Sequence, residues 1–319
     1  MNAVERAEWL EWRRAGIGAS DVAALVGLSQ WAEPLTVWLD KMSLLDDDEP
    51  SFRQQSGIDL EPVLATWFER ATGLYAMHPQ RRVEHPDWPV ARATLDADVI
   101  DAGYDEADGD HLVGVVDWKT EGGYGRKWDE IPLHYQCQGQ WQMYVTGTER
   151  MWFGVLHGLY AFEVYELARD DQDIATLRAA AERFWTDHVV AGIPPAPVGT
   201  VRELQALARA FPDHEPHAGV QVDAGVIAEW RNARSIRKKW QTIENVHKAQ
   251  IMLELGEAEI GYVGEQVAVT WRTTRPKKVR DLEAAWQRLG PHQQQELTTV
   301  GATQRRLLDK GQPDDNDQR

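Results

Sequence analysis

The stretch GVVDWKT, residues 114–120, is an apolar run that ends in an aspartate, a tryptophan and a lysine. Successive side chains of a β-strand point to opposite faces, so Asp117 and Lys119 share one face. Trp118 lies between them, faces the other side and is expected to pack against a helix. A surface ion pair is one interpretation of Asp117 and Lys119, and a metal-dependent catalytic site is the other.

A second acid stands at the end of the preceding apolar run. Asp96 closes this run in ATLDADV, residues 93–99. Asp98, two residues further on, shares the face of Asp96 and is the alternative candidate. The helical segment after GVVDWKT contributes Gln138, and an earlier helical segment contributes Glu61.

These side chains make chemical sense as a group. Hard divalent cations such as Mg²⁺ prefer oxygen ligands, typically one or two carboxylates together with water and substrate phosphates. Two carboxylates on adjacent strands can share such an ion, and a lysine on the same face can orient a water molecule. The pattern of Asp96 followed by Asp117 and Lys119 therefore indicates phosphodiester hydrolysis, although a D-x-K triplet alone is also typical of surface ion pairs.

The order of helical and extended patterns predicts a mixed sheet flanked by helices, an α/β (α+β) fold. The clearest helix covers 54–73, where apolar residues recur near a period of 3.6, Pro62 is placed near the first turn and Gly73 ends the helix. Other helices are expected within 1–13, 21–27, 33–45, 131–147 and 171–192, and strands within 75–86, 90–101, 111–121 and 150–169.

Segments rich in proline and glycine at 192–200 and 211–220 predict a connector between two regions. The expected division is a core at 1–200, a linker at 201–223, a C-terminal region at 224–310 and a disordered tail at 311–319. The C-terminal region is expected to hold a long basic helix over 224–255, a hairpin over 259–274, and a basic segment that turns helical over 275–290.

Charge and cysteine content limit the classes of protein. The net charge of −17 argues against a nonspecific nucleic-acid binder. The charge is uneven, because residues 224–280 hold 11 Lys/Arg and 6 Asp/Glu, a balance of +5, which leaves −22 for the rest. The single cysteine, Cys137, excludes an internal disulfide framework and a cysteine-ligated cluster. Because no apolar stretch is long enough for a membrane span and the first residues lack a secretory h-region, an intracellular protein without membrane contact is expected.

Five sequence blocks follow one another along the chain. They are WRRAGIGASDVAALVGLSQW (12–31), GIDLEPVLATWFERATG (57–73), HPDWPVARATLDADV (85–99), GVVDWKT (114–120) and YQCQGQWQMYVTG (135–147). In this order they resemble the YqaJ-type viral recombinase family, which groups with the phage lambda-type alkaline exonucleases in the PD-(D/E)xK nuclease superfamily. The resemblance covers roughly residues 9–190, and the restriction-endonuclease-like core that it implies fits the expected mixed sheet.

The resemblance implies a role for each polar residue. Asp96 and Asp117 are expected to bind the metal, and Lys119 is expected to be the catalytic lysine. Glu61 is similar to the helix acid that completes the metal site directly or through water. Gln138 is similar to the glutamine that supports the site from the following helix. Its alternative is Gln140.

The resemblance also implies a pocket for a terminal 5′-phosphate. Arg13 and Ser20 match the residues that form this pocket, and Arg14 is the alternative to Arg13 after a shift of one residue. An arginine, a hydroxyl and the amides at a helix start suit an anion. Ser20 or Asp21 is also expected to cap the short helix that follows.

The function that the resemblance implies is a Mg²⁺-dependent exodeoxyribonuclease, with Mn²⁺ as the alternative ion. It is expected to digest linear double-stranded DNA from 5′ to 3′ and to leave 3′ overhangs for a single-strand annealing partner in phage-type recombination. By analogy, the chain is expected to form a trimeric ring and to be a phage- or prophage-encoded protein of the bacterial cytoplasm. The alternatives are another PD-(D/E)xK endonuclease or nickase, and a non-catalytic protein that binds DNA ends.

Overall fold

The computed structural model describes residues 3–46, 51–101, 112–122, 127–158, 161–273, 287–289, 291 and 295. The chain divides into two compact units, with the boundary between Pro212 and Asp213. Within the described part, no helix is long and apolar enough to span a membrane.

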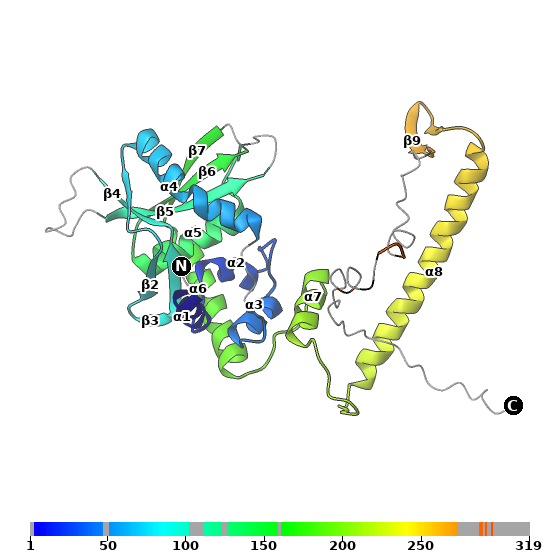
Figure 1. Ribbon diagram of the computed structural model, residues 1–319, viewed down its shortest axis with the longest axis horizontal. Coiled ribbons are helices and arrows are strands. Elements are labelled where there is room, and N and C mark those ends of the chain that lie inside the picture. Colours follow the sequence, from blue (N-terminus) through cyan, green and yellow to red (C-terminus); the bar gives the residue numbers. More distant parts are fainter. Residues whose placement is uncertain are drawn as a thin grey trace. The chain divides into compact units, whose positions relative to one another are not determined.

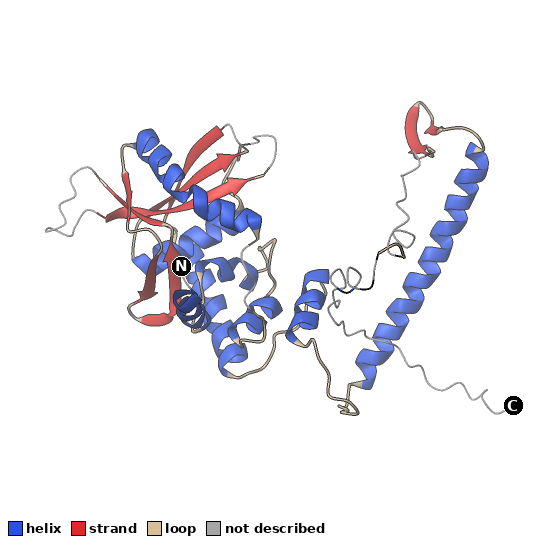
Figure 2. Cartoon of the chain, viewed as in Figure 1, coloured by secondary structure: helices blue, strands red, loops and turns tan. Residues whose placement is uncertain are grey.

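The first unit is built on a five-stranded mixed sheet with the strand order β1-β4-β5-β6-β7 (Figures 1 and 2). β5 and β6 run parallel, and the other neighbours are antiparallel. A separate two-stranded ladder pairs β2 with β3. The strands are β1 (Tyr75–Met77), β2 (Arg81–His85), β3 (Trp88–Leu95), β4 (Ala97–Ile100), β5 (Leu112–Glu121), β6 (Arg150–His157) and β7 (Ala161–Ala168).

Helices cover both faces of the five-stranded sheet, which confirms the predicted layers (Figure 1). On one face, α4 packs Leu64 and Phe68 against Trp118. On the other face, α5 packs with Phe153 and with the helices around it. The helices of this unit are α1 (Ala3–Arg14), α2 (Ala19–Leu25), α3 (Pro34–Lys41), α4 (Phe52–Thr72), α5 (Leu133–Thr146), α6 (Asp171–Phe184) with its π-helical extension η1 (Trp185–Val190), and α7 (Val201–Ala210).

The expected extended segments at 75–86 and 90–101 each divide into two strands. The second division matters for the site, because Asp96 lies at the junction where the chain leaves the β2–β3 ladder and enters the large sheet. The predicted strand alternation on β5 is confirmed. Trp118 lies in the core cluster of α4, and its ring meets that of Phe68 edge to face at 5.7 Å between centroids.

Two local predictions are wrong. The helix α4 begins at Phe52 rather than 54, because Ser51 caps it and accepts a hydrogen bond from the N–H of Gln54 at 3.4 Å. Pro62 lies in the helix interior rather than near the first turn. The cap of α2 is Gly18, and Asp21 supports it by accepting the Gly18 N–H at 2.9 Å.

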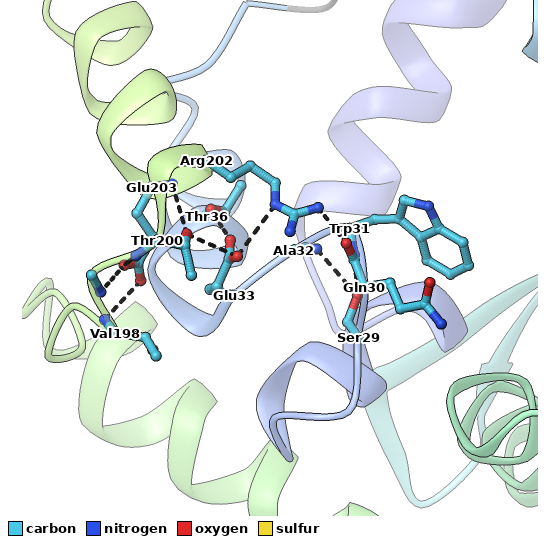
Figure 3. A network of polar contacts seen from close by, with 11 residues as sticks. Ser29, Gln30, Trp31, Ala32, Glu33, Thr36, Val198, Thr200, Arg202 and Glu203 are labelled. Atoms are coloured by element: carbon cyan, nitrogen blue, oxygen red, sulfur yellow. Dashed lines mark hydrogen bonds and ion pairs between the residues drawn. The ribbon is translucent and has the colours of Figure 1, made fainter. Parts of the chain in front are cut away.

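A polar network fixes α7 to the segment before α3 (Figure 3). Glu203 is almost fully buried and accepts the N–H groups of Val198, Gly199 and Thr200 at 3.1, 2.6 and 3.2 Å. Glu33 accepts from the Thr200 hydroxyl at 2.9 Å and from the Arg202 Nε at 3.2 Å. Every buried carboxylate oxygen of this network thus meets a donor, as burial requires.

The second unit contains the predicted long helix and hairpin. The helix α8 (Ala224–Leu255) is capped by Asp223, which accepts the Val226 N–H at 2.9 Å. It is followed by the strands β8 (Ile260–Val263) and β9 (Gln266–Thr270), which pair antiparallel. Most of the segment predicted as basic and then helical at 275–290, and the whole tail at 311–319, lie outside the described residues.

Candidate functional site

The predicted pair on β5 forms inside the protein rather than at its surface. The Lys119 Nζ lies 2.5 Å from the Asp117 Oδ1. The side chain of Asp117 is 4% exposed and that of Lys119 is 15% exposed. Charges are costly to bury unless they are paired and hydrogen-bonded. A surface ion pair therefore does not describe this arrangement.

Two glutamines of α5, one helical turn apart, hold this pair. Gln138 donates from its Nε2 to the Asp117 Oδ2 and accepts from the Lys119 Nζ at 3.1 Å with its Oε1. Gln142 donates to the same Asp117 oxygen at 3.0 Å. Since residues i and i+4 lie on one helix face, α5 presents both amides to β5.

Gln140, the alternative to Gln138, lies elsewhere. Its Nε2 donates to the Ala168 carbonyl at 2.8 Å, and its Oε1 accepts the Asp170 N–H at 2.9 Å. Gln138 is thus the predicted glutamine that contacts the pair. Sequence reasoning missed Gln142, although its spacing of four from Gln138 was the signal that could have found it.

Asp96 enters the site from the β3–β4 junction. Its Oδ2 accepts the backbone N–H of Trp118 at 2.8 Å, which ties it to β5. Burial, and then the neighbouring charge of Asp117, raise the pKa of Asp96 well above its ordinary value. Asp98, the alternative acid, is engaged instead by Arg81 at 2.6 Å and by His78 at 3.1 Å.

Glu61 lies on α4 and lines a cleft of about 470 Å³. Its Oε2 accepts from the Gln80 Nε2 at 3.0 Å. Burial raises the pKa of Glu61, and the charge of Asp117 adds to the effect. Asp96, Asp117 and Glu61 therefore affect one another electrostatically. Among the described residues, however, no three His, Cys, Asp or Glu side chains gather closely enough to hold a metal ion by themselves.

The donor set nevertheless fits a hard divalent cation at Asp96 and Asp117. Two carboxylates lie close enough that the charge of one raises the pKa of the other. A divalent cation would relieve this repulsion, and carboxylate oxygens are the ligands it prefers. Glu61 is the candidate for a third ligand that binds through water, because it does not lie close enough to Asp96 and Asp117 for all three carboxylates to hold one ion directly.

The predicted phosphate residues separate in space. Arg13 lines the cleft of Glu61, together with Arg6 and Arg82. Arg14 is committed to Asp40 at 3.2 Å and to a backbone carbonyl at 2.7 Å.

Ser20 is exposed in the first turn of α2 and is not among the residues that line the cleft. Arg13 is thus the only one of the three predicted phosphate residues on that cleft. It places a guanidinium, a group suited to phosphate, in the space that Glu61 also faces.

The fold and this site define a class of domain in which an acid at a strand junction, Asp96, lies beside an Asp-x-Lys triplet on a strand of a mixed sheet. Residues 8–149 match the model of the YqaJ-like viral recombinase domain. The expected family resemblance is thereby confirmed: this part of the chain is similar to the YqaJ-like viral recombinase domain.

Comparison with known proteins gives relatives of the same kind. The uncharacterized protein YqaJ of Bacillus subtilis (strain 168) is 29% identical over 274 residues, which are 83% of each chain. The alkaline exonuclease LHK-Exo of Laribacter hongkongensis is similar in structure, with 20% identity and a TM-score of 0.45 over 59% of this chain and 94% of that one. A phage related exonuclease from Haemophilus somnus 129PT has 12% identity and a TM-score of 0.41 over 56% of this chain and 96% of that one.

Proposed function

We propose that the chain is a metal-dependent exodeoxyribonuclease that digests linear double-stranded DNA from 5′ to 3′ and leaves 3′ overhangs. The observation that carries the proposal is the buried pair of Asp117 and Lys119, held by Gln138 beside Asp96. The relatives with exonuclease names support the same class of reaction.

The side chains divide the work of phosphodiester hydrolysis. Asp96 and Asp117 would hold Mg²⁺ or Mn²⁺, which when bound supplies charge stabilisation at the phosphate and activation of water. Lys119 is fixed by Asp117 and Gln138 and has the ring of Tyr135 at 4.7 Å from its Nζ. A fixed ammonium needs no reorganisation to stabilise the negative charge that develops on phosphate.

The cleft of Glu61 is the proposed path of the DNA strand. Its three arginines, Arg6, Arg13 and Arg82, provide positive charge for phosphates. Arg13 is the proposed contact to the terminal 5′-phosphate, with Ser20 as the second.

The test uses 5′-phosphorylated linear duplex, labelled at either end of one strand, with Mg²⁺, Mn²⁺ or EDTA. We expect cleavage only with metal, and early release of the 5′ label. Asp117→Asn and Lys119→Gln are each expected to lower kcat by about 100-fold or more, as the loss of a preorganised electrostatic group does. Lys127→Gln, which changes an exposed lysine on the same sheet side, is the control and should retain activity.

Three results would contradict the proposal. Equal degradation of circular and linear duplex would point to an endonuclease or nickase, and early release of the 3′ label would reverse the direction. Binding of DNA ends without cleavage in either metal would leave the non-catalytic alternative.

The partners are inferred from the family resemblance. We propose a single-strand annealing protein that receives the 3′ overhang, a homotrimeric ring around the DNA, and action in the bacterial cytoplasm on behalf of a phage or prophage. Sedimentation velocity of the full chain tests the trimer. A monomer at micromolar concentration, with and without DNA, would contradict it.

A further inference from the structure

Trp31 lies in the loop between α2 and α3, and 55% of its surface is exposed. The loop is ordered by its own hydrogen bonds. The Ser29 hydroxyl accepts the backbone N–H groups of Trp31 and Ala32, each at 3.1 Å. Such a turn fixes the direction in which the tryptophan leaves the backbone.

A second set of bonds holds the same loop from α7. The Arg202 guanidinium donates to the carbonyl of Gln30 and, at 3.2 Å, to Glu33. Figure 3 shows that the indole of Trp31 points away from this network. The loop is therefore anchored on both sides of Trp31, while the side chain itself takes no part in the anchoring.

The indole lies beside the rings next to the candidate catalytic lysine. Its ring meets that of His134 edge to face at 4.8 Å and that of Tyr135 at 5.9 Å between centroids. The Tyr135 ring also contacts Lys119, whose Nζ lies 4.7 Å from the ring centroid. One aromatic ring thus separates the exposed indole from the ammonium that is proposed to face the scissile phosphate.

A purely structural role explains this tryptophan poorly. Tyrosine and tryptophan contribute to a fold mainly through the area they bury, and more than half of this indole is exposed. An anchored loop that presents an exposed aromatic ring is typical of a binding surface.

We propose that Trp31 stacks on a nucleobase of the DNA strand whose backbone lies at Lys119. The inference rests on the proposed function, because it is that reaction which brings a strand to this position. Every base has a π-face, so stacking holds a strand without regard to its sequence. The platform of Trp31, His134 and Tyr135 would set the register of the strand against the catalytic lysine.

The test measures stacking without cleavage. Duplexes with a 5′-phosphate and 2-aminopurine at one of the first terminal positions are bound to the full chain in EDTA, and fluorescence is recorded. We expect wild-type protein to quench the probe at one or two neighbouring positions. Trp31→Phe should retain part of this quenching, whereas Trp31→Leu and Trp31→Met, which are apolar but lack a ring, should lose it.

Cleavage kinetics provide the second measurement. Trp31→Leu should raise KM roughly 5- to 150-fold, the range that the loss of one stacked base produces, and change kcat less. Thermal unfolding is recorded for every variant, and Trp31→Phe, which keeps a ring against His134 and Tyr135, should unfold like the wild type. If Trp31→Leu fails to fold, Trp31→Met takes its place.

The proposal and the proposed function fail in different ways. Quenching that depends on residue 31 without any cleavage in metal would support stacking and contradict the nuclease. Cleavage with equal KM and equal quenching for wild type and Trp31→Leu would overturn the stacking and leave the nuclease standing. Absence of DNA binding by wild type would overturn the stacking as well.

Discussion

Gln142 holds the carboxylate of Asp117 from a position that is 1% exposed. Among the described residues, its Oε1 has no hydrogen-bond partner. An unpaired buried oxygen lowers stability, so this side chain is costly for folding alone. The N–H that it donates to Asp117 fixes the candidate metal ligand and gives this side chain a role in the site.

We therefore expect Gln142→Leu to lower Mn²⁺ affinity without lowering stability. Loss of a group that supports a metal ligand typically costs 10- to 100-fold in metal affinity, and leucine removes the unpaired oxygen. Mn²⁺ binding is measured by electron paramagnetic resonance without DNA, and stability by urea unfolding.

Gln140→Leu, on the same helix, is the matched control with the opposite outcome. It leaves the Asp170 N–H and the Ala168 carbonyl unpaired, which should cost about 1–3 kcal/mol of stability. Mn²⁺ affinity should not change. Equal effects of the two variants on Mn²⁺ binding would exclude a positioning role for Gln142.

A second buried pair, Lys41 and Asp21, holds the end of α1 that carries Arg13. The Lys41 Nζ lies 2.6 Å from the Asp21 Oδ2 and donates to the Arg13 carbonyl at 3.1 Å. The Lys41 side chain is 0% exposed. Asp21→Asn would leave this ammonium buried without its counter-charge, and should cost about 3–5 kcal/mol in urea unfolding.

The control is Asp40→Asn, which breaks the more exposed pair of Asp40 with Arg14. That variant should lose only about 0–1 kcal/mol. Adding Lys41→Met to Asp21→Asn should restore most of the loss. A single Asp21→Asn variant no less stable than Asp40→Asn would show that the pair contributes nothing.

The same pair predicts a pH dependence. Burial by itself raises the pKa of Asp21, but the charges of Lys41 and Arg13 and two hydrogen bonds outweigh burial, so the pKa lies below its ordinary 3.8. A carboxyl whose pKa is lower in the folded state stabilises the fold at pH values above its pKa in the unfolded chain. This stability is lost as the pH falls through its pKa in the folded state. The stability difference between wild type and Asp21→Asn should be constant above about pH 5 and shrink as the pH falls below 3.8, through the lower pKa of the folded state. A difference that grows on acidification would contradict this sign.

At the scale of elements, alternation along β5 was the most informative signal in the sequence. It predicted that Asp117 and Lys119 share a face and that Trp118 packs on a helix, because a strand has a fixed period of two. The sequence could not show that the pair is buried, since burial depends on α5, a separate element. Nor could it predict that Arg81 and His78 engage Asp98, which follows from the pairing of strands in space.

The helix α4 illustrates a second limit. Its apolar spacing predicted its existence and its end at Gly73, but not its start, because the cap at Ser51 is a local hydrogen bond that periodicity does not reveal. Pro62 lies in the interior of this helix. Proline has no N–H to donate to the carbonyl of Ile58, and this weakens the helix one residue after Glu61.

Pro62→Ala should raise stability by about 1–3 kcal/mol, because alanine restores the helical hydrogen bond. DNA cleavage should fall several-fold, since a restored hydrogen bond at residue 62 shifts the backbone next to Glu61 and so its carboxylate relative to Gln80. Urea unfolding and kcat/KM are measured together. Val63→Ala, at the next and partly exposed position, is the control and should show no gain in stability. A Pro62→Ala variant that is no more stable than wild type would mean that the helix already compensates for the proline.

For the whole molecule, the distribution of charge matters more than its sum. The chain carries −17, yet residues 231–248 of α8 hold six Lys/Arg and one acid. A local run of positive charge can attract DNA to an otherwise acidic protein. Arg237, Lys238 and Lys239 are exposed on this helix, so their replacement should not affect folding.

We expect the triple variant Arg237→Gln, Lys238→Gln and Lys239→Gln to bind duplex DNA with a weaker dependence on salt. Each phosphate contact contributes about 0.9 to the slope of log K against log salt, so three lost contacts lower the slope by about 2.7. The affinity for DNA is measured by fluorescence anisotropy in EDTA over a range of salt. Because α8 contributes no residue to the candidate catalytic pair, kcat at saturating DNA should be unchanged.

The matched control removes the same charge from the first unit, at the exposed Arg70, Arg150 and Arg183. Both triple variants have a net charge of −20, three below the −17 of the wild type. An effect of overall charge would lower DNA affinity equally in the two. A specific role of α8 requires that only its own variant changes the salt slope, because only direct phosphate contacts release counterions. Equal slopes for the two variants would thus assign DNA attraction to the net charge and leave α8 without a part in binding.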